Sequence, residues 1–204
     1  MPTTPRQWDE KYRAGAEGPA QEPTTILREL LPLLPKGPAL DLACGTGRNV
    51  LFLMYRQPVT AVDRSESALE VIEHRARKAG ISVCRGMQID AARAGVCVIS
   101  ADLETAKLPS EQFALIVCTR YLERRLFREM VTALKPGGAL LFETYTMAQM
   151  DFAGGPKDPL YLLERGELRM AFPELKTVFY RELSAGQGMA SLLATKPPRM
   201  SASS

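Results

Sequence analysis

The feature that most constrains this chain is a short apolar segment that runs directly into a glycine turn. Residues 39–43 are apolar except for Asp41 and are predicted to form a strand, and Gly45-Thr-Gly47 follows at once, with a helix predicted from about Asn49. Glycine at such a turn lets the backbone approach a ligand that a Cβ would push away, and the first turn of the helix offers free N–H groups. This unit indicates an α/β domain with a ligand site at the strand ends.

The rest of the chain alternates strands and helices. Strands are predicted at residues 59–63, 96–101, 113–118 and 139–144, and helices at 26–34, 67–78, 122–134 and 165–171. Helices between strands give right-handed crossovers and a parallel sheet, whereas the closely spaced strands at 176–183 and 189–195 are expected to pair antiparallel. We therefore predict an α/β fold, a doubly wound Rossmann-like seven-stranded mostly parallel sheet with an antiparallel C-terminal strand pair.

The domain boundaries follow from composition. With 204 residues, 46% of them hydrophobic, the chain suits one domain, which we place at residues 24–196. Residues 1–23, with a short helix at 8–13, are predicted to be a flap or linker, and the Pro- and Ser-rich residues 197–204 a disordered tail. Residues 81–84 are also strand-like, but we do not assign them, because an extra helical turn, a surface insertion and an irregular loop all remain open for the segment before residue 102.

Composition also excludes several classes of function. No stretch approaches the ~18 consecutive apolar residues of a membrane span, and the amino terminus lacks the layout of a signal peptide, so we expect a cytoplasmic protein without a membrane partner. A net charge of +3 gives no reason to expect nucleic acid. The four cysteines show no C-x-x-C spacing, so we interpret them as small buried hydrophobes and expect no metal site.

Polar residues follow each predicted strand. Ligands of an open parallel sheet collect beyond the carboxyl ends of its strands. Asp63 ends the second strand at the spacing at which an acid meets ribose hydroxyls, and Asp102-Leu103 after the third strand suit an adenine amino group and ring face. The nicotinamide fingerprint would need a third glycine at position 50, where the chain has Val50, and no P-loop motif is present.

These residues resemble the motifs of class I S-adenosylmethionine-dependent methyltransferases. The resemblance lies in Leu40-Asp-Leu-Ala-Cys-Gly-Thr-Gly47 and in residues 61–63, 100–103 and 134–138, and at the level of fold it covers roughly residues 24 to 195. It implies S-adenosyl-L-methionine as cofactor, with the glycines at its methionine part, Asp63 at the ribose and Asp102 and Leu103 at the adenine. The cofactor-binding residues that we expect are Asp41, Gly45, Thr46, Gly47, Asn49, Asp63, Arg64, Asp102, Leu103 and Thr119.

A narrower resemblance points to the bacterial tellurite-resistance methyltransferase group. It rests on Arg48-Asn49, on residues 166–169 and on the final strand ending at residues 194–196. That group carries a His-Arg pair between its last two strands, whereas the corresponding connection here, Ser184-Ala-Gly-Gln-Gly188, contains neither residue. The narrower resemblance therefore does not carry tellurite over as the acceptor.

Few residues are available for acid–base chemistry. Methyl transfer from a sulfonium is an in-line displacement that needs alignment and a dry pocket more than a base. The only histidine, His74, falls within a helix away from the strand ends, so a thiol or a chalcogen oxyanion fits better as acceptor than a group that must lose a proton. The catalytic candidates are the polar residues after the fourth and fifth strands, Arg120, Tyr121 and Tyr145.

Alternatives remain for several candidates. Arg120 could instead lie with Arg124, Arg125 and Arg128 on a solvated helix face, and Trp8 and Tyr12, one helical turn apart, could form a lid or pack on the edge of the sheet. Residues 158–161, Asp-Pro-Leu-Tyr, resemble the D-P-P-Y motif of nucleic-acid methyltransferases but follow the fifth strand, so we do not place them in the site.

The function predicted from the sequence is methyl transfer to a small-molecule acceptor. A non-catalytic S-adenosylmethionine-binding regulatory protein and a methyltransferase acting on RNA or protein are the alternatives. The oligomeric state is left open.

Overall fold

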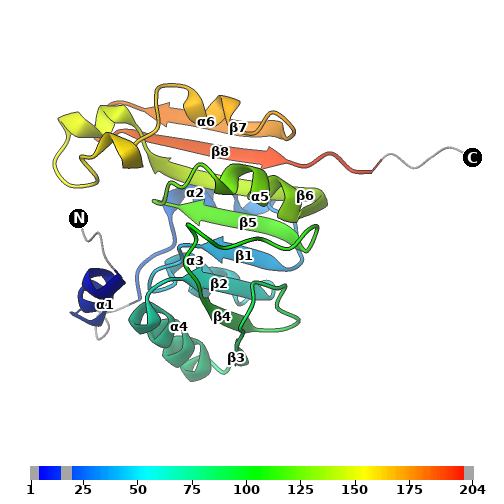
Figure 1. Cartoon of the computed structure of the whole chain (residues 1–204). Helices are drawn as coiled ribbons and strands as arrows, with labels where there is room; N and C mark the ends of the chain where they lie inside the picture. The colour runs from blue at the N-terminus through cyan, green and yellow to red at the C-terminus, as the bar shows by residue number, and fades with distance from the viewer. Residues whose placement is uncertain (1–4, 15–19, 200–204) are drawn as a thin grey trace, which may run out of the picture.

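The computed structural model describes residues 5–14 and 20–199, and over these residues the core is one eight-stranded sheet (Figure 1). The spatial order of the strands is β3-β4-β2-β1-β5-β6-β8-β7. The strands are β1 Ala39–Leu42, β2 Val59–Asp63, β3 Val83–Arg85, β4 Val96–Ser100, β5 Phe113–Thr119, β6 Leu134–Tyr145, β7 Lys176–Leu183 and β8 Met189–Thr195. The helices are α1 Pro5–Ala14, α2 Thr25–Leu30, α3 Arg48–Leu53, α4 Glu66–Lys78, α5 Leu126–Ala133 and α6 Glu167–Met170, with 3₁₀ turns η1 Leu31–Leu33, η2 Met147–Asp151 and η3 Pro159–Tyr161.

The pairing directions confirm a mostly parallel, Rossmann-like sheet. Strands β1 to β6 pair in parallel with one another, and β8 runs antiparallel to both β6 and β7. The predicted number of strands was wrong, because β3 adds an eighth strand at the edge beside β4. It overlaps the strand-like residues 81–84, which were left unassigned, and it is only three residues long with no buried side chain.

Helices cover both faces of the sheet, as a doubly wound fold requires. On one face, side chains of α2, α3 and α4 such as Ile26, Val50 and Ile72 pack against strand residues of the same cluster. On the other face, Met130 of α5 and Leu168 of α6 join the second cluster. Because successive strand residues point to opposite faces, nearly every residue of β1, β2 and β5 is buried.

The helix boundaries differ from the predictions by a few residues. Helix α5 begins at Leu126 rather than at residue 122, and β6 already begins at Leu134 instead of 139. Helix α4 is capped by Ser65, whose Oγ accepts a hydrogen bond from the N–H of Ala68 at 3.2 Å. Thr24 stands at the N-cap position of α2, but its hydroxyl donates to Asn49 and makes no capping bond to the helix.

The cysteines divide into two kinds. Cys44 and Cys118 are free and buried, as expected of small hydrophobes. That interpretation was wrong for Cys84 and Cys97, which lie opposite each other in the β3–β4 register, 4.5 Å apart at Cα, and form a disulfide. The register between two strands, which sequence spacing does not reveal, brings them together. Within the described residues, no cluster of His, Cys, Asp or Glu could hold a metal ion.

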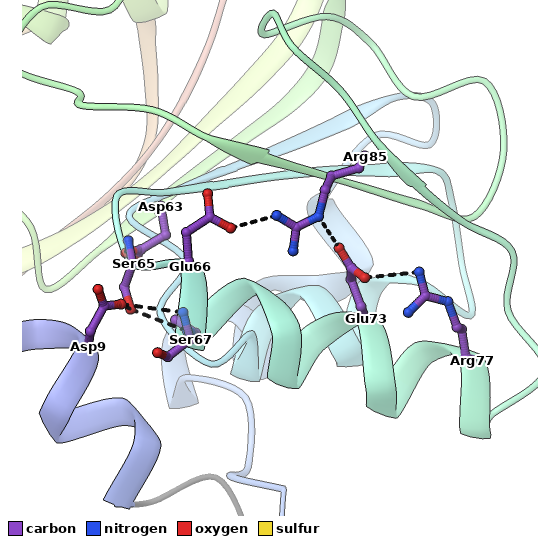
Figure 2. A network of polar contacts seen from close by, with 9 residues as sticks. Asp9, Asp63, Ser65, Glu66, Ser67, Glu73, Arg77 and Arg85 are labelled. Carbon is purple, nitrogen blue, oxygen red and sulfur yellow. Dashed lines mark hydrogen bonds and ion pairs between the residues drawn. The ribbon is translucent and has the colours of Figure 1, made fainter.

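Strand β3 is also fastened to α4 by ion pairs. Arg85 lies 2.5 Å from Glu66 and 2.6 Å from Glu73, and Glu73 in turn pairs with Arg77 at 2.9 Å (Figure 2).

In the described part of the chain, no helix is long and apolar enough to cross a membrane.

Helix α1 confirms the short helix predicted at residues 8–13. It packs against α4 at one end of the molecule (Figure 1) rather than on the edge of the sheet. Residues 15–19 of the predicted linker and residues 200–204 of the predicted tail lie outside the described residues. Residues 197–199 belong to no helix or strand.

Candidate active site

A cavity opens at the carboxyl ends of the strands, and the central strand β1 divides its lining into two halves. After β2 and β4, on one side of β1, the lining is formed by Asp63, Arg64, Ala101, Asp102, Leu103 and Glu104. After β5 and at the end of β6, on the other side, it is formed by Arg120, Tyr121, Leu122, Thr144 and Tyr145. The order of strands reverses at β1, which is where open α/β sheets bind their ligands.

Asp41 contributes a buried acceptor just behind the glycine turn. Its side chain is 1% exposed, and its Oδ2 is buried without a hydrogen-bond partner. Burial raises the pKa of this carboxyl group well above its usual value, and the nearby Asp63 raises it further, against the opposing effect of Arg48. A buried carboxyl group with an unpartnered oxygen would be stabilised by a cationic hydrogen-bond donor.

Asp63 is anchored by the same turn. One of its oxygens accepts the N–H of Gly45 at 2.7 Å and the other accepts the N–H of Ser65 at 3.0 Å. Burial still raises the pKa of the carboxyl group above its usual value, although these backbone bonds lower it. Because each carboxylate oxygen has two lone pairs, Asp63 keeps acceptor capacity toward the cavity that it lines.

The glycine turn itself is shaped by packing. Gly47 has a φ of +81°, and a Cβ built on it would lie 2.5 Å from Cγ1 of Ile72 in α4. Ala43, which lines the cavity, also has a left-handed φ of +53°. Such a conformation is uncommon outside glycine and clusters at functional sites.

Asp102 and Leu103 lie as the sequence predicted, at the end of β4 and in the cavity wall. Asp102 is exposed and accepts the N–H of Glu104 at 3.0 Å, and Leu103 is buried. Arg64 lies 3.8 Å from Glu104 across this part of the cavity. A flat ring entering here would meet an apolar side chain and a hydrogen-bond acceptor.

Six predicted cofactor residues lie outside the cavity lining: Asp41, Gly45, Thr46, Gly47, Asn49 and Thr119. Asn49 is buried, accepts both the N–H and the hydroxyl of Thr24 at 3.0 Å, and donates to Thr119 Oγ1 at 3.1 Å. Asn49 and Thr119 therefore hold α2, α3 and β5 together. Thr46 is half-buried in the turn. A cofactor contact by any of the six remains a prediction.

The catalytic candidates Arg120, Tyr121 and Tyr145 all line the cavity. Arg120 is exposed, but it lines the cavity from the end of β5 and does not belong to α5, which begins at Leu126. Arg124 pairs with Glu167, and Arg125 pairs with Glu123. Burial, reinforced by Cys118, raises the pKa of Tyr121, which keeps its hydroxyl protonated at neutral pH.

Helix α1 brings Tyr12 into the wall of the cavity. A Cβ on Gly45 would lie 3.1 Å from the Tyr12 hydroxyl, and burial raises the pKa of that tyrosine. Asp9 joins α1 to the start of α4, because its Oδ1 accepts hydrogen bonds from Ser65 Oγ and from the N–H of Ser67 (Figure 2). The side chain of Trp8 lies outside the described residues. The position of Tyr12 favours the lid interpretation of this helix.

Sequence reasoning missed the contribution of residues 146–163. Thr146 bridges to Leu163, and the N–H of Met147 donates to the Leu163 carbonyl at 2.9 Å, so the segment folds back over the sheet end. Pro156 and Tyr161 thereby line the cavity, although residues 158–161 were excluded because they follow the fifth strand. A loop that returns to the site in this way leaves no periodic signal.

Replacing Asp9 with alanine is expected to speed the release of a bound nucleoside ligand by roughly threefold to tenfold. The change removes the acceptor that holds α1 beside Asp63, so Tyr12 would leave the cavity wall more often. Stopped-flow dissociation measures the effect, and the exposed Asp151 replaced with alanine is the control. Equal dissociation rates in Asp9→Ala and wild type would show that α1 does not retain the ligand.

Comparison with known proteins agrees with this geometry. A family model described as a methyltransferase domain matches residues 39–138. The structure is similar to TehB from Haemophilus influenzae, with a TM-score of 0.67 and 19% identity over 93% of this chain and 67% of that one. It is similar to the N-methyltransferase NodS from Bradyrhizobium japonicum, with a TM-score of 0.60 and 20% identity over 85% and 93% of the two chains.

A third similar structure is named for a different reaction. The [4+2]-cyclase SpnF has a TM-score of 0.68 and 17% identity, over 97% of this chain and 98% of its own. At these identities the structural similarities establish the fold alone. A search of curated proteins finds no match. Residues 39–138 match a methyltransferase domain, and the described residues have the fold of the class I S-adenosylmethionine-dependent methyltransferases, whose cofactor is S-adenosylmethionine.

Proposed function

We propose that this protein transfers the methyl group of S-adenosylmethionine to a small-molecule acceptor. The observation that carries the proposal is that one cavity joins an acidic half, after β2 and β4, to a half with an arginine and tyrosines, after β5 and β6. The first half suits a nucleoside and the second leaves room for a second reactant. The fold alone does not select the reaction, since a cyclase shares it.

The residues of the first half fit the cofactor. Asp63 suits its ribose hydroxyls, and Asp102 with Leu103 its adenine. Asp41 lies buried behind the glycine turn, outside the lining, and its unpartnered Oδ2 suits the ammonium group. Gly45, Thr46, Gly47, Asn49, Arg64 and Thr119 complete the set that we expect at or around it. The bound cofactor supplies a methyl group that is already activated on a sulfonium.

The side chains of the second half position the acceptor and exclude water. Tyr121 remains protonated and can donate a hydrogen bond to the acceptor. No histidine is found in the lining of the described cavity, and His74 is exposed on α4. We therefore propose an acceptor that is soft or already anionic, such as a thiol or a chalcogen oxyanion, rather than one that must be deprotonated by a histidine.

Titration calorimetry tests the proposal in two steps. Wild-type protein is titrated with S-adenosylmethionine and S-adenosylhomocysteine, with NAD as the control, and then assayed with thiols and chalcogen oxyanions. Binding of the first two ligands with methyl transfer to one acceptor class supports the proposal. Binding without transfer to any of these acceptors would favour the non-catalytic regulatory alternative, and no binding by a folded protein would overturn the assignment of the cavity.

Replacing Tyr121 with phenylalanine is expected to lower kcat by about tenfold while leaving the affinity for S-adenosylmethionine unchanged. The hydroxyl lies in the second half of the cavity, across β1 from the residues assigned to the cofactor. Calorimetry and steady-state kinetics measure the two quantities. Tyr55→Phe is the control, because Tyr55 is 70% exposed. A loss of cofactor affinity in Tyr121→Phe would contradict the division of the cavity.

A further inference from the structure

The second half of the cavity holds a guanidinium group that is not used by the fold. Arg120 lines the cavity from the end of β5, and within the described residues it forms no ion pair. Other arginines around the site do, since Arg64 pairs with Glu104 and Arg124 with Glu167. Glu143, the carboxyl group near Arg120, is bonded to the hydroxyl of Ser191 at 2.6 Å instead.

The backbone holds Arg120 in place at a cost. Its φ of +59° is left-handed, a conformation that is strained for an L-residue. The N–H of Arg120 donates to the carbonyl of Glu143 at 2.7 Å, which fixes the turn at the end of β5. A non-glycine residue kept in this conformation at a strand end is typical of a functional site.

A second cation lies close to Arg120. Arg48, the first residue of α3, is half-buried, and its pKa is lowered by burial and by the charge of Arg120. Its guanidinium is hydrogen-bonded to Gln21, a neutral side chain. Glu143 partly offsets the charge of Arg120, and Asp41 that of Arg48, but neither arginine forms an ion pair within the described residues. Two neighbouring guanidinium groups favour an anion, and Arg120 offers paired donors suited to a carboxylate.

The walls around Arg120 are aromatic and apolar. Tyr121 and Leu122 follow it directly, Tyr145 ends β6, and Pro156 and Tyr161 close the cavity from the returning segment. A bare inorganic oxyanion would need hydrogen-bond donors on most sides. Rings and aliphatic side chains suit a carbon skeleton instead.

We propose that the acceptor is a small organic acid whose carboxylate is bound by Arg120 and whose nucleophilic atom lies elsewhere on an apolar or aromatic skeleton. The inference rests on the proposed function and names its substrate class. A guanidinium on the nucleophilic atom itself would occupy the lone pair that must attack, so the anchored anion and the nucleophile are separate groups. For a thiol-bearing acid, the thiol proton passes to water and the thiolate sulfur bonds the methyl carbon as the carbon–sulfonium bond breaks, its electron pair remaining on the donor sulfur.

The test compares an acid with its uncharged ester. Protein saturated with S-adenosylhomocysteine is titrated with benzoate, methyl benzoate and selenite, in wild type, in Arg120→Gln and in Arg128→Gln. Arg128 is the matched control because it is exposed on α5, outside the cavity. A second variant, Arg120→Gly, removes the side chain and relieves the left-handed backbone, so its loss of binding would not reflect misfolding.

Wild type and Arg128→Gln are expected to bind benzoate at least about tenfold more tightly than methyl benzoate. Both Arg120 variants should lose this preference while their affinity for S-adenosylhomocysteine stays unchanged. The kcat/KM preference for 4-mercaptobenzoate over benzenethiol should fall in parallel. The inference is overturned if benzoate binds no better than the ester, if Arg120→Gln keeps the preference, or if selenite binds as tightly as benzoate. Arg120-dependent benzoate binding without methylation of any thiol would preserve it and reject only the thiol nucleophile, whereas no S-adenosylhomocysteine binding would reject the proposed function itself.

Discussion

Asp41→Asn is expected to stabilise the ligand-free protein and to weaken its affinity for S-adenosylmethionine. The carboxyl group is fully buried, its Oδ2 has no partner, and its pKa is raised well above the usual value, first by burial and then by Asp63. The folded state therefore holds the proton more tightly than the unfolded state, so stability falls as the pH rises from the unfolded pKa toward the folded one. Asparagine cannot ionise, and it can still accept the bond from the N–H of Val50.

The gain in stability is expected to be about 1–3 kcal/mol at neutral pH, and the loss of cofactor affinity about tenfold to a hundredfold. The affinity of wild type should rise with pH through the ligand-free pKa of Asp41, because an ammonium group favours the ionised carboxylate, and the variant should lack this dependence. Thermal unfolding and calorimetry across pH measure both, with the exposed Asp151→Asn as control. A variant that loses stability and affinity together would make Asp41 a structural residue.

Gly47→Ala is expected to destabilise the protein by about 2–4 kcal/mol, from roughly 1–2 kcal/mol of left-handed backbone strain and the remainder from overpacking. The new Cβ would lie 2.5 Å from Cγ1 of Ile72, which is fully buried and cannot move aside cheaply. Gly80→Ala is the matched control, since Gly80 has a φ of +74° and open space around it. The difference between the two variants in chemical denaturation measures the steric part.

The same pair of variants separates packing from ligand contact at the glycine turn. Gly47 lies outside the cavity lining, so folded Gly47→Ala should retain most of its cofactor affinity. Equal stability losses in Gly47→Ala and Gly80→Ala would mean that α4 yields to the new methyl group. If Gly47→Ala folds but does not bind the cofactor, Gly47 contacts the methionine part of the cofactor, as the sequence motif implies.

Topology explains why much of the site was predictable. Parallel strands send their carboxyl ends to one edge, so Asp63, Asp102 and Arg120 could be grouped without knowing any contact between them. Asn49 and Thr119 show the limit of this reasoning. They follow the same strands and turn, yet they bond Thr24 and each other, and a sequence does not distinguish a polar residue that holds elements together from one that faces a ligand.

Contacts between segments that lie far apart in the sequence were not predictable. Tyr161 reaches the cavity because residues 146–163 fold back by a single bridge, which has no periodicity to detect. Strand β3 was left ambiguous because three residues without buried side chains carry too little apolar pattern. Whether α1 acts as a lid could not be predicted, because its position depends on the hydrogen bonds of Asp9. The partners of Asp9 are Ser65 and Ser67, more than fifty residues further along the chain.

The disulfide between Cys84 and Cys97 bears on how the protein behaves in concentrated solution. Strand β3 covers the outer edge of β4, whose N–H and C=O groups would otherwise be open to pairing with another chain. With the disulfide reduced, that cover depends on a short stretch of backbone pairing and on the ion pairs of Arg85. In a buffer with a thiol reductant, the edge of β4 will therefore be exposed more often than in a buffer without one. The protein should self-associate more strongly in the reducing buffer.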